Sequence, residues 1–340
     1  MSLLTRWPEN QLCLGDDERR DAVRALERAF ASTLETLRVD IGLVEMFEAI
    51  YVPLAAWLVC HQRRLGAPLV VGVNGAQGAG KATLFNLLEL TLGDGFGLRV
   101  AGISIDDLYK TRAERERLAR EVHPLLITRG VPGTHDIELG AQLLRALKGG
   151  EGDCLRIPVF DKSVDDRCPP SVWQEWSGVA DLVVLEGWCV GARPQAESEL
   201  REPVNALERD EDPDGAWRRY VNAQLAGPYR SLFDQVDVQI MLQVPSMDAV
   251  YQWRTLQELK LAERMQHLYD AGEPTDHLRI MGQGEIHRFI QHYERLTRAM
   301  LADMPPRADV ILRLNDNHKI ADIRVNRPIP ECGKQMMPDV

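Results

Sequence analysis

The stretch Leu69-Val-Val-Gly-Val-Asn-Gly-Ala-Gln-Gly-Ala-Gly-Lys-Ala-Thr83 decides how this chain folds. Its first five residues form an apolar run that predicts a strand, and the leucines of residues 84–90 recur at helical spacing. Between them, Gly75 to Lys81 match the pattern G-x4-G-K. Glycines let backbone N–H groups converge on an anion, and a helix start adds partial positive charge. The strand, loop and helix order therefore favours a phosphate-binding loop over its alternative, a structural glycine turn.

The residues of this loop predict a nucleotide site with one unusual position. We expect the nucleotide-contacting residues to be Gly75, Ala76, Gln77, Gly78, Ala79, Gly80, Lys81, Ala82 and Thr83. In such loops the lysine is followed by Ser or Thr, whose hydroxyl binds Mg²⁺, and here Ala82 follows it. Thr83 is turned by about 100° from that position, so it does not simply replace the hydroxyl. Water can fill the place instead; weakened activity and an engineered substitution are both open readings of Ala82.

The remaining apolar runs predict an α/β fold. Runs at residues 98–105, 155–160, 181–185, 236–244 and 310–314 alternate with helical stretches. This alternation is typical of a mostly parallel sheet covered by helices on both faces. Apolar residues at helical spacing predict helices over 16–38, 53–65, 246–272 and 286–300. Residues 193–214 are rich in acidic side chains and proline, which predicts a solvated loop without chemistry.

Composition excludes several classes of protein. The 340 residues are 45% hydrophobic and 27% charged, as in globular proteins and unlike disordered or collagen-like chains. The net charge of -11 repels phosphate polymers, so we expect no nucleic-acid partner. The longest apolar run, residues 49–60, is shorter than the roughly 20 residues that span a membrane. Scattered cysteines and an N-terminus without signal-like character favour a cytoplasmic protein.

Two further segments place carboxylates where open α/β sheets bind their ligands. Ser104-Ile-Asp-Asp-Leu-Tyr-Lys110 follows one predicted strand, so Asp106 is a candidate general base or magnesium-side carboxylate. The alternative is that Asp106 or Asp107 caps the helix beginning near Arg112. The next segment, Asp181-Leu-Val-Val-Leu-Glu186, is a strand ending in an acid, which is typical of the magnesium side of a P-loop enzyme. Its alternative is a strand-end acid satisfied by local hydrogen bonds.

Five motifs in this order resemble the D-glycerate 3-kinase family and its kinase-like relatives, within the wider group of uridine and pantothenate kinases. They are GAQGAGKAT (75–83), SIDDLYK (104–110), RGVPGTHD (129–136), PVFDKSVDDR (158–167) and VVLEGW (183–188). The likeness covers most of residues 68–318. It implies a P-loop NTPase fold, three-layered α/β/α, with a mostly parallel five-stranded sheet and a helical lid. The resemblance also implies that the chain divides into a helical N-terminal extension (1–67), a kinase domain (68–325) and a tail (326–340).

The resemblance also implies roles for single residues. It makes Asp106 the base, places Glu186 near Mg²⁺, and puts Arg254 where lid arginines stabilise the transferring phosphoryl group. The cofactors implied are ATP and Mg²⁺. For a small acceptor we single out polar and cationic residues of these motifs: Tyr109, Arg129, His135, Asp161, Lys162 and Arg167. Two alternatives stay open, namely that His135-Asp136 begins a helix and that Asp161-Lys162 is a loop ion pair.

The function expected is transfer of the γ-phosphate of ATP to a hydroxyl of D-glycerate or a similar hydroxy-acid, the partner being a small molecule. One alternative is a nucleotide-binding protein with weak or no turnover, because Ala82 lacks the hydroxyl. Another is a kinase for a different small alcohol, such as a nucleoside or a pantothenate-like acceptor. The residues alone fix neither the acceptor, nor the oligomeric state, nor the choice between ATP and GTP.

Overall fold

The computed structural model describes residues 5–12, 15, 17, 20–22, 26, 47–149, 154–270 and 281–329. The helix expected over 16–38 and the end of the expected tail lie mostly outside the described residues. Among the described residues, no helix has both the length and the apolar character that crossing a bilayer requires.

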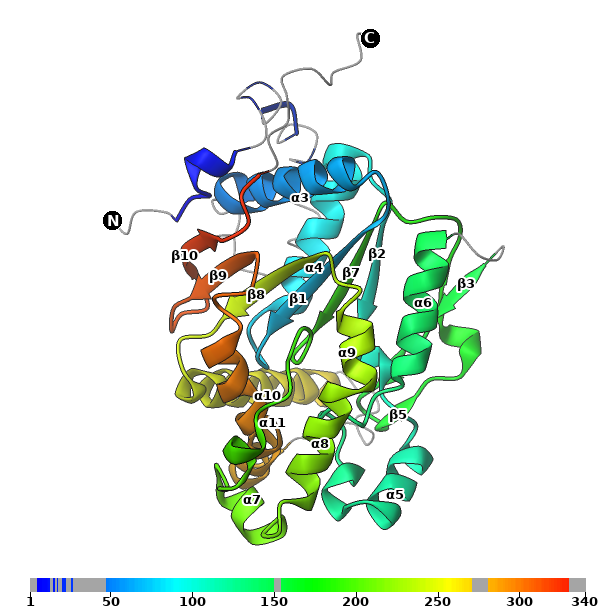
Figure 1. The fold of residues 1–340 in the computed structure, drawn as a ribbon, viewed down its shortest axis with the longest axis vertical. Helices are drawn as coiled ribbons and strands as arrows, with labels where there is room; N and C mark the ends of the chain where they lie inside the picture. Colours follow the sequence, from blue (N-terminus) through cyan, green and yellow to red (C-terminus); the bar gives the residue numbers. More distant parts are fainter. Residues whose placement is uncertain are drawn as a thin grey trace.

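A six-stranded sheet forms the centre of the molecule (Figure 1), in the order β10-β9-β8-β1-β7-β2. Its strands are β1 (Leu69–Gly75), β2 (Val100–Ser104), β7 (Leu182–Gly187), β8 (Val238–Gln243), β9 (Val310–Leu314) and β10 (Ile320–Val325). Strands β2, β7, β1, β8 and β9 run parallel, which confirms the five expected parallel strands. The sequence did not predict β10, which pairs antiparallel with β9 at the edge.

The run at residues 155–160 is not a strand of this sheet, contrary to expectation. Its first part, β3 (Leu155–Ile157), pairs antiparallel with β6 (Gln174–Trp176). Phe160–Asp161 (β4) then pairs with Asp166–Arg167 (β5) in a short hairpin. The prediction failed because a short apolar run does not reveal which strand it will pair with.

Helices cover both faces of the sheet and give a three-layer α/β/α fold (Figure 1). On one face α3 (Val52–Leu65) and α4 (Lys81–Leu90) share a core with Val71 and Val73 of β1. On the other face α6 (Ile137–Gly149), α9 (Pro228–Phe233) and the second half of α11 (Gln283–Asp303) pack on Val70 and its neighbours. Successive strand residues point to opposite faces, which explains the continuous apolar runs of a sheet buried on both sides.

The helix expected over 53–65 is confirmed as α3, and its ends follow from sequence. Pro53 occupies the first turn, where a missing N–H costs nothing, and Gly66 ends the helix with a φ of 65°. Its buried residues pack with Trp7 and Tyr51 against the same core as β1. The helix therefore supports the strand that leads into the phosphate-binding loop.

The acidic segment 193–214 is not a solvated loop, and this prediction was wrong. It contains α7 (Ala206–Glu211) and leads into α8 (Ala216–Ala226). Glu208 is fully buried and binds Arg295 of α11 at 2.7 Å, while the buried Asp212 binds Arg218 at 2.9 Å. Counting charges along the chain could not show these partners, because Arg295 lies 87 residues away from Glu208.

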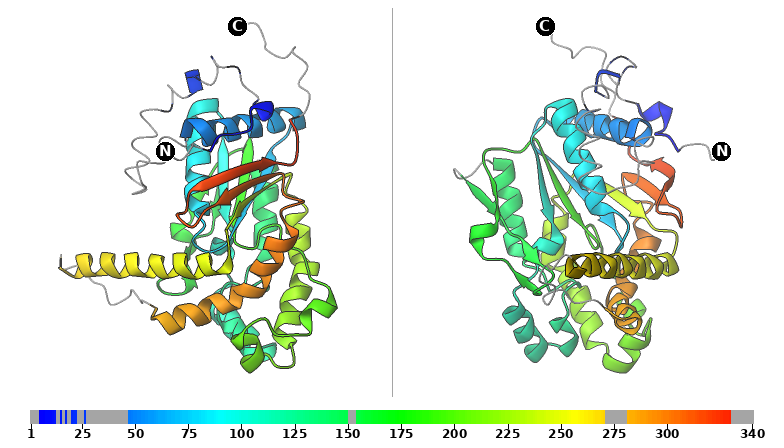
Figure 2. Two further views of the ribbon diagram at one scale, coloured as in Figure 1. Left: turned by 90° about the vertical axis from the view of Figure 1, so that its left-hand side faces the viewer. Right: turned by 180° about the vertical axis from the view of Figure 1, so that it is seen from behind.

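The remaining helices gather at the carboxyl ends of the parallel strands. The helix α5 (Arg112–Glu121) follows β2, and α10 (Met247–Asp270) follows β8. Figure 2 shows α10 crossing that edge of the sheet and projecting beyond the body of the molecule. Together with α11 it closes one side of a cavity over the strand ends.

Candidate active site

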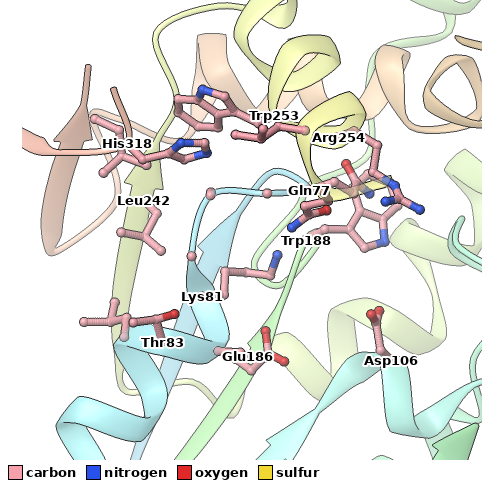
Figure 3. Close-up of a pocket in the computed structure, with 18 of the residues that line it drawn as sticks. Gln77, Lys81, Thr83, Asp106, Glu186, Trp188, Leu242, Trp253, Arg254 and His318 are labelled. Carbon is pink, nitrogen blue, oxygen red and sulfur yellow. The ribbon is translucent and has the colours of Figure 1, made fainter. Parts of the chain in front are cut away.

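A cavity of about 760 Å³ lies at the carboxyl ends of the strands (Figure 3). Its walls come from the loop after β1, the ends of β2 and β7, the helices α10 and α11, and the turn between β9 and β10. Seven of the nine expected loop residues, Gln77 to Thr83, line it, whereas Gly75 and Ala76 are buried beneath. The cavity is therefore built where open α/β sheets bind ligands.

The loop after β1 has the backbone conformation that a phosphate cradle needs. Gly78 and Gly80 have φ values of 81° and 89°, a region that residues with a Cβ rarely adopt. A Cβ at Gly78 would also lie only 3.0 Å from the Cβ of Trp253 on α10. The loop and α10 are thus in close contact, and glycine is what allows their approach.

Lys81 begins α4 and extends into this cavity (Figure 3). Its ammonium donates to the carbonyl oxygen of Ala76 at 3.3 Å, which folds the side chain back over the loop. Burial lowers the pKa of Lys81, and the nearby carboxylates of Glu186 and Asp106 oppose that shift. The Lys81 side chain and these two carboxylates therefore interact within one cavity.

Ala82 and Thr83 both line the cavity, but only Thr83 carries a hydroxyl. Figure 3 shows Thr83 beside Leu242, on the far side of Lys81 from Asp106. This placement agrees with the expectation that one step along the helix carries the hydroxyl away from the position of Ala82.

Asp106 lies in a short 3-10 turn directly after β2 and is held through both oxygens. Tyr109 donates its hydroxyl to Oδ1 at 2.9 Å, and the Lys162 ammonium donates to Oδ2 at 2.6 Å. Burial alone would raise the pKa of Asp106, but the charges of Lys162 and Lys81 outweigh it and lower the pKa to about 2. The group is therefore an ionised carboxylate at neutral pH.

Neither aspartate of the Ser104–Lys110 segment caps the following helix. Thr111 caps α5 instead, in a capping box with Glu114. Asp107 accepts the backbone N–H of Phe160 at 2.9 Å and so fastens the β4–β5 hairpin to the end of β2. The alternative capping role considered from sequence is therefore contradicted, and the two neighbouring aspartates serve different ends.

Glu186 ends β7 directly beside Ser104 in the strand register. Ser104 donates its hydroxyl to Glu186 Oε1 at 2.5 Å. Glu186 therefore makes a local hydrogen bond of the kind that the alternative interpretation, a strand-end acid without a catalytic role, expects. The described residues contain no cluster of three or more potential ligands for a metal ion. Mg²⁺ in nucleotide sites usually takes one or two carboxylates plus phosphates and waters. The oxygen donors of Glu186 and Asp106 fit that modest requirement.

The six candidate acceptor residues divide into two groups. Tyr109, Arg129 and Lys162 belong to the described lining of the cavity, and His135, Asp161 and Arg167 do not. Arg167 donates to the carbonyl oxygen of Tyr109 at 2.7 Å and faces Asp136, so it braces the chain behind the cavity.

His135 and Asp161 also have local partners. His135 is buried, stacks on Tyr109 and lies 2.6 Å from the hydroxyl of Tyr229, and burial lowers its pKa to about 3. Asp136 accepts the N–H of Leu139, so the alternative of a helix start holds for that residue. Asp161 accepts from Ser163, while the ion pair that Lys162 makes is with Asp106. Sequence spacing could not show this pairing across 56 residues.

Arg254 lines the cavity from α10. It pairs with Glu258 one turn further along the helix and lies 5.5 Å from the ring centre of Phe289 on α11. Figure 3 shows its guanidinium near Gln77 and Trp188, above the phosphate-binding loop. The charge of Arg254 therefore lies at the cavity, and its role as a lid arginine stays a prediction.

One wall of the cavity was not foreseen as part of a site. Trp253 and His318 lie in contact, with ring centres 3.8 Å apart and ring planes tilted by 32°, and the Trp253 indole donates to the carbonyl of Asp316. The turn between β9 and β10 contributes Asn317 and Lys319 to the same wall. From sequence, Trp253 is only one of the apolar residues of the helix predicted over 246–272, and the polar turn carries no recognisable motif.

Comparison with known proteins places this cavity in context. No protein-family model matches the chain. The chain is 31% identical over 235 residues to the uncharacterized kinase mug58 of Schizosaccharomyces pombe, covering 67% of this chain and 79% of that kinase. It is 27% identical over 286 residues to the chloroplastic D-glycerate 3-kinase of Arabidopsis thaliana, covering 79% of this chain and 57% of the plant protein.

Among solved structures, a D-glycerate 3-kinase from Cryptococcus neoformans var. grubii superposes with a TM-score of 0.64 at 26% identity. That match covers 80% of this chain and 97% of the fungal protein. The fold is therefore shared with a kinase over most of the chain.

Proposed function

The chain belongs to the P-loop kinases, and we propose that it transfers the γ-phosphate of ATP to a hydroxyl of D-glycerate or a similar small hydroxy-acid. The observation that carries this proposal is the position of the Asp106 carboxylate in the cavity, close enough to Lys81 for their charges to interact. A phosphate cradle and a candidate base in one cavity are the parts that phosphoryl transfer to an alcohol requires.

In this proposal the loop from Gly75 to Thr83 holds the phosphates of ATP through its backbone N–H groups. Lys81 and Arg254 supply positive charge on either side of the transferring group. Glu186, directly or through water, and Asp106, through water, would hold Mg²⁺, which when bound neutralises charge on the phosphates. With Ala82 in place of the usual hydroxyl, a water molecule would supply the oxygen that is missing there.

Asp106 serves as the base. As the acceptor oxygen bonds to the γ-phosphorus, the hydroxyl proton passes to a carboxylate oxygen of Asp106. The bond between that phosphorus and the bridging oxygen of ADP breaks, so the products are ADP and a phosphate monoester. Tyr109, which donates to Oδ1, keeps the carboxylate oriented during this transfer.

The test is a paired assay of the protein and its Ala82→Ser variant with ATP, Mg²⁺ and a panel of hydroxy-acids, nucleosides and pantothenate. Phosphorylated product is identified by mass spectrometry. We expect product from D-glycerate or a close analogue in both forms, with faster turnover or a lower Mg²⁺ requirement in the serine variant. Absence of product from every acceptor in both forms would refute the kinase function.

Ala82 favours a second candidate, a nucleotide-binding protein with little or no turnover. It predicts that ATP raises the melting temperature of both forms although neither gives product. Product with a nucleoside or pantothenate but none with a hydroxy-acid would instead keep the kinase and replace its acceptor.

A further inference from the structure

We propose that Lys162 holds the base Asp106 in an ion pair until the carboxylate of the acceptor draws it off, so that only a short anionic alcohol activates the site. This inference rests on the proposed kinase function. It adds a residue that determines which class of acceptor is phosphorylated. Its basis is the geometry of one ion pair and of the hairpin that carries Lys162.

Both oxygens of Asp106 are occupied, and their partners differ in mobility. Tyr109, which donates to Oδ1, is only 3% exposed and is fixed by its stacking on His135. The Lys162 side chain, which donates to Oδ2, is 60% exposed. An ammonium on Oδ2 stabilises the ionised carboxylate against taking a proton, so Lys162 is the partner that must give way before Asp106 can act as a base.

The hairpin fixes Lys162 near Asp106 without fixing its ammonium. Asp107 binds the backbone N–H of Phe160 at the base of the hairpin, and Arg115 binds both the carbonyl and the carboxylate of Asp165 further along. The chain on both sides of Lys162 is therefore tied to the segment that carries Asp106. Its long, exposed side chain can turn from Oδ2 to a nearby anion while the backbone stays in place.

Two other cations that line the cavity, Arg129 and Arg254, already have partners that are not the base. Arg129 pairs with Asp165, and Arg254 pairs with Glu258. Figure 3 shows the Asp106 carboxylate pointing into the cavity on the side of Arg254 and Trp188. Lys162 is thus the one of these three whose release from its partner also frees the base.

The distance limits the acceptor. Because the backbone of Lys162 is tied near Asp106, its ammonium reaches only anions within the length of its own side chain, so one molecule can engage both groups only if its hydroxyl and its anion lie a few bonds apart. A short hydroxycarboxylate meets this condition. A neutral polyol has no anion to draw Lys162 away, and a long acid places its carboxylate too far from the reacting hydroxyl.

The experiment compares D-glycerate with glycerol, in which a neutral hydroxymethyl group replaces the carboxylate. Lys162→Met removes the charge at nearly constant length, and Lys148→Met in the last turn of α6 is the matched control. With ATP and Mg²⁺ we expect Lys162→Met to lower kcat/KM for D-glycerate about tenfold to a hundredfold, as for a lost charge-assisted hydrogen bond. The value for glycerol stays the same or rises, and the control matches the unmodified protein.

Equal losses for both acceptors would overturn the inference, since Lys162 would then act on the phosphates. Unchanged values for both would overturn it as well. Calorimetry of D-glycerate binding, with a non-hydrolysable ATP analogue present, separates this question from turnover. We expect at least tenfold weaker binding to Lys162→Met, and equal binding would refute the role of Lys162. Absence of phosphorylation in all forms, with that difference in binding intact, would refute the kinase function alone.

Discussion

Replacing Asp106 by Asn tests the assignment of the base most directly. The amide oxygen can still accept the Tyr109 hydroxyl, so the side chain keeps its orientation, but the NH₂ group then faces the ammonium of Lys162. Two donors cannot pair, so Lys162 is released and remains available to an anionic acceptor. A base contributes about 10²- to 10⁴-fold, or roughly 3 to 5 kcal/mol of barrier. We therefore expect kcat to fall by that factor while KM for D-glycerate stays the same or decreases.

The assay is steady-state formation of phosphorylated product at saturating ATP. Asp107→Asn is the matched control, because the neighbouring aspartate accepts only the Phe160 N–H in this region and an amide oxygen can do the same. Its kcat should stay within about threefold, as for a substitution away from the reacting atoms. The reasoning fails if Asp106→Asn keeps more than a tenth of kcat, or if KM alone rises, which would make Asp106 a binding group.

Three further predictions concern the loop and the buried charges. Gly78→Ala should weaken ATP binding, measured by calorimetry, about tenfold, because alanine is strained at a positive φ and its Cβ would contact Trp253. Gly66→Ala is the control: no described atom lies within 4 Å of a Cβ built there, and ATP binding should be unchanged. Arg295→Met should lower the free energy of unfolding by about 3 to 5 kcal/mol in urea titrations, because Glu208 stays buried without its cation. Arg298 is exposed, and Arg298→Met should lower it by less than about 1 kcal/mol. Equal losses would contradict the importance of the buried pair. Burial lowers the pKa of His292 to about 4, below the unfolded value near 6.5, so the unfolded state binds more protons in this range. The free energy of unfolding should therefore fall as the pH is lowered from about 6.5 toward 4. His292→Gln should flatten that slope, and an unchanged slope would contradict the role of His292.

The sheet could be predicted because its signals are local. Each parallel strand is buried on both faces, so β1, β7, β8 and β9 appear in the sequence as continuous apolar runs. The edge strand β10 was missed because only Ile320 and Ile323 are buried there, among exposed polar residues. An edge strand covered on one side carries too few apolar residues to stand out in a single sequence.

The acceptor end of the site could be predicted only as residue types. Tyr109, His135 and Arg167 belong to motifs of the same resemblance, yet only Tyr109 lines the described cavity. A motif gives the order of residues, whereas the direction of each side chain depends on the hairpin and on α6. For the same reason the pairing of Lys162 with Asp106, carried by different motifs, could be found only from the structure.

The strand register explains why the nucleotide end of the site was easier to predict. Glu186 lies beside Ser104 of β2 and beside Val73 of β1, so the acid, the turn of Asp106 and the loop of Lys81 all leave adjacent parallel strands at one level. A slip of one residue would turn Glu186 to the other face of the sheet. The acceptor end depends instead on a two-residue pairing between β4 and β5 and on helices outside the sheet. Changes in that hairpin should therefore alter the choice of acceptor while leaving nucleotide binding nearly constant.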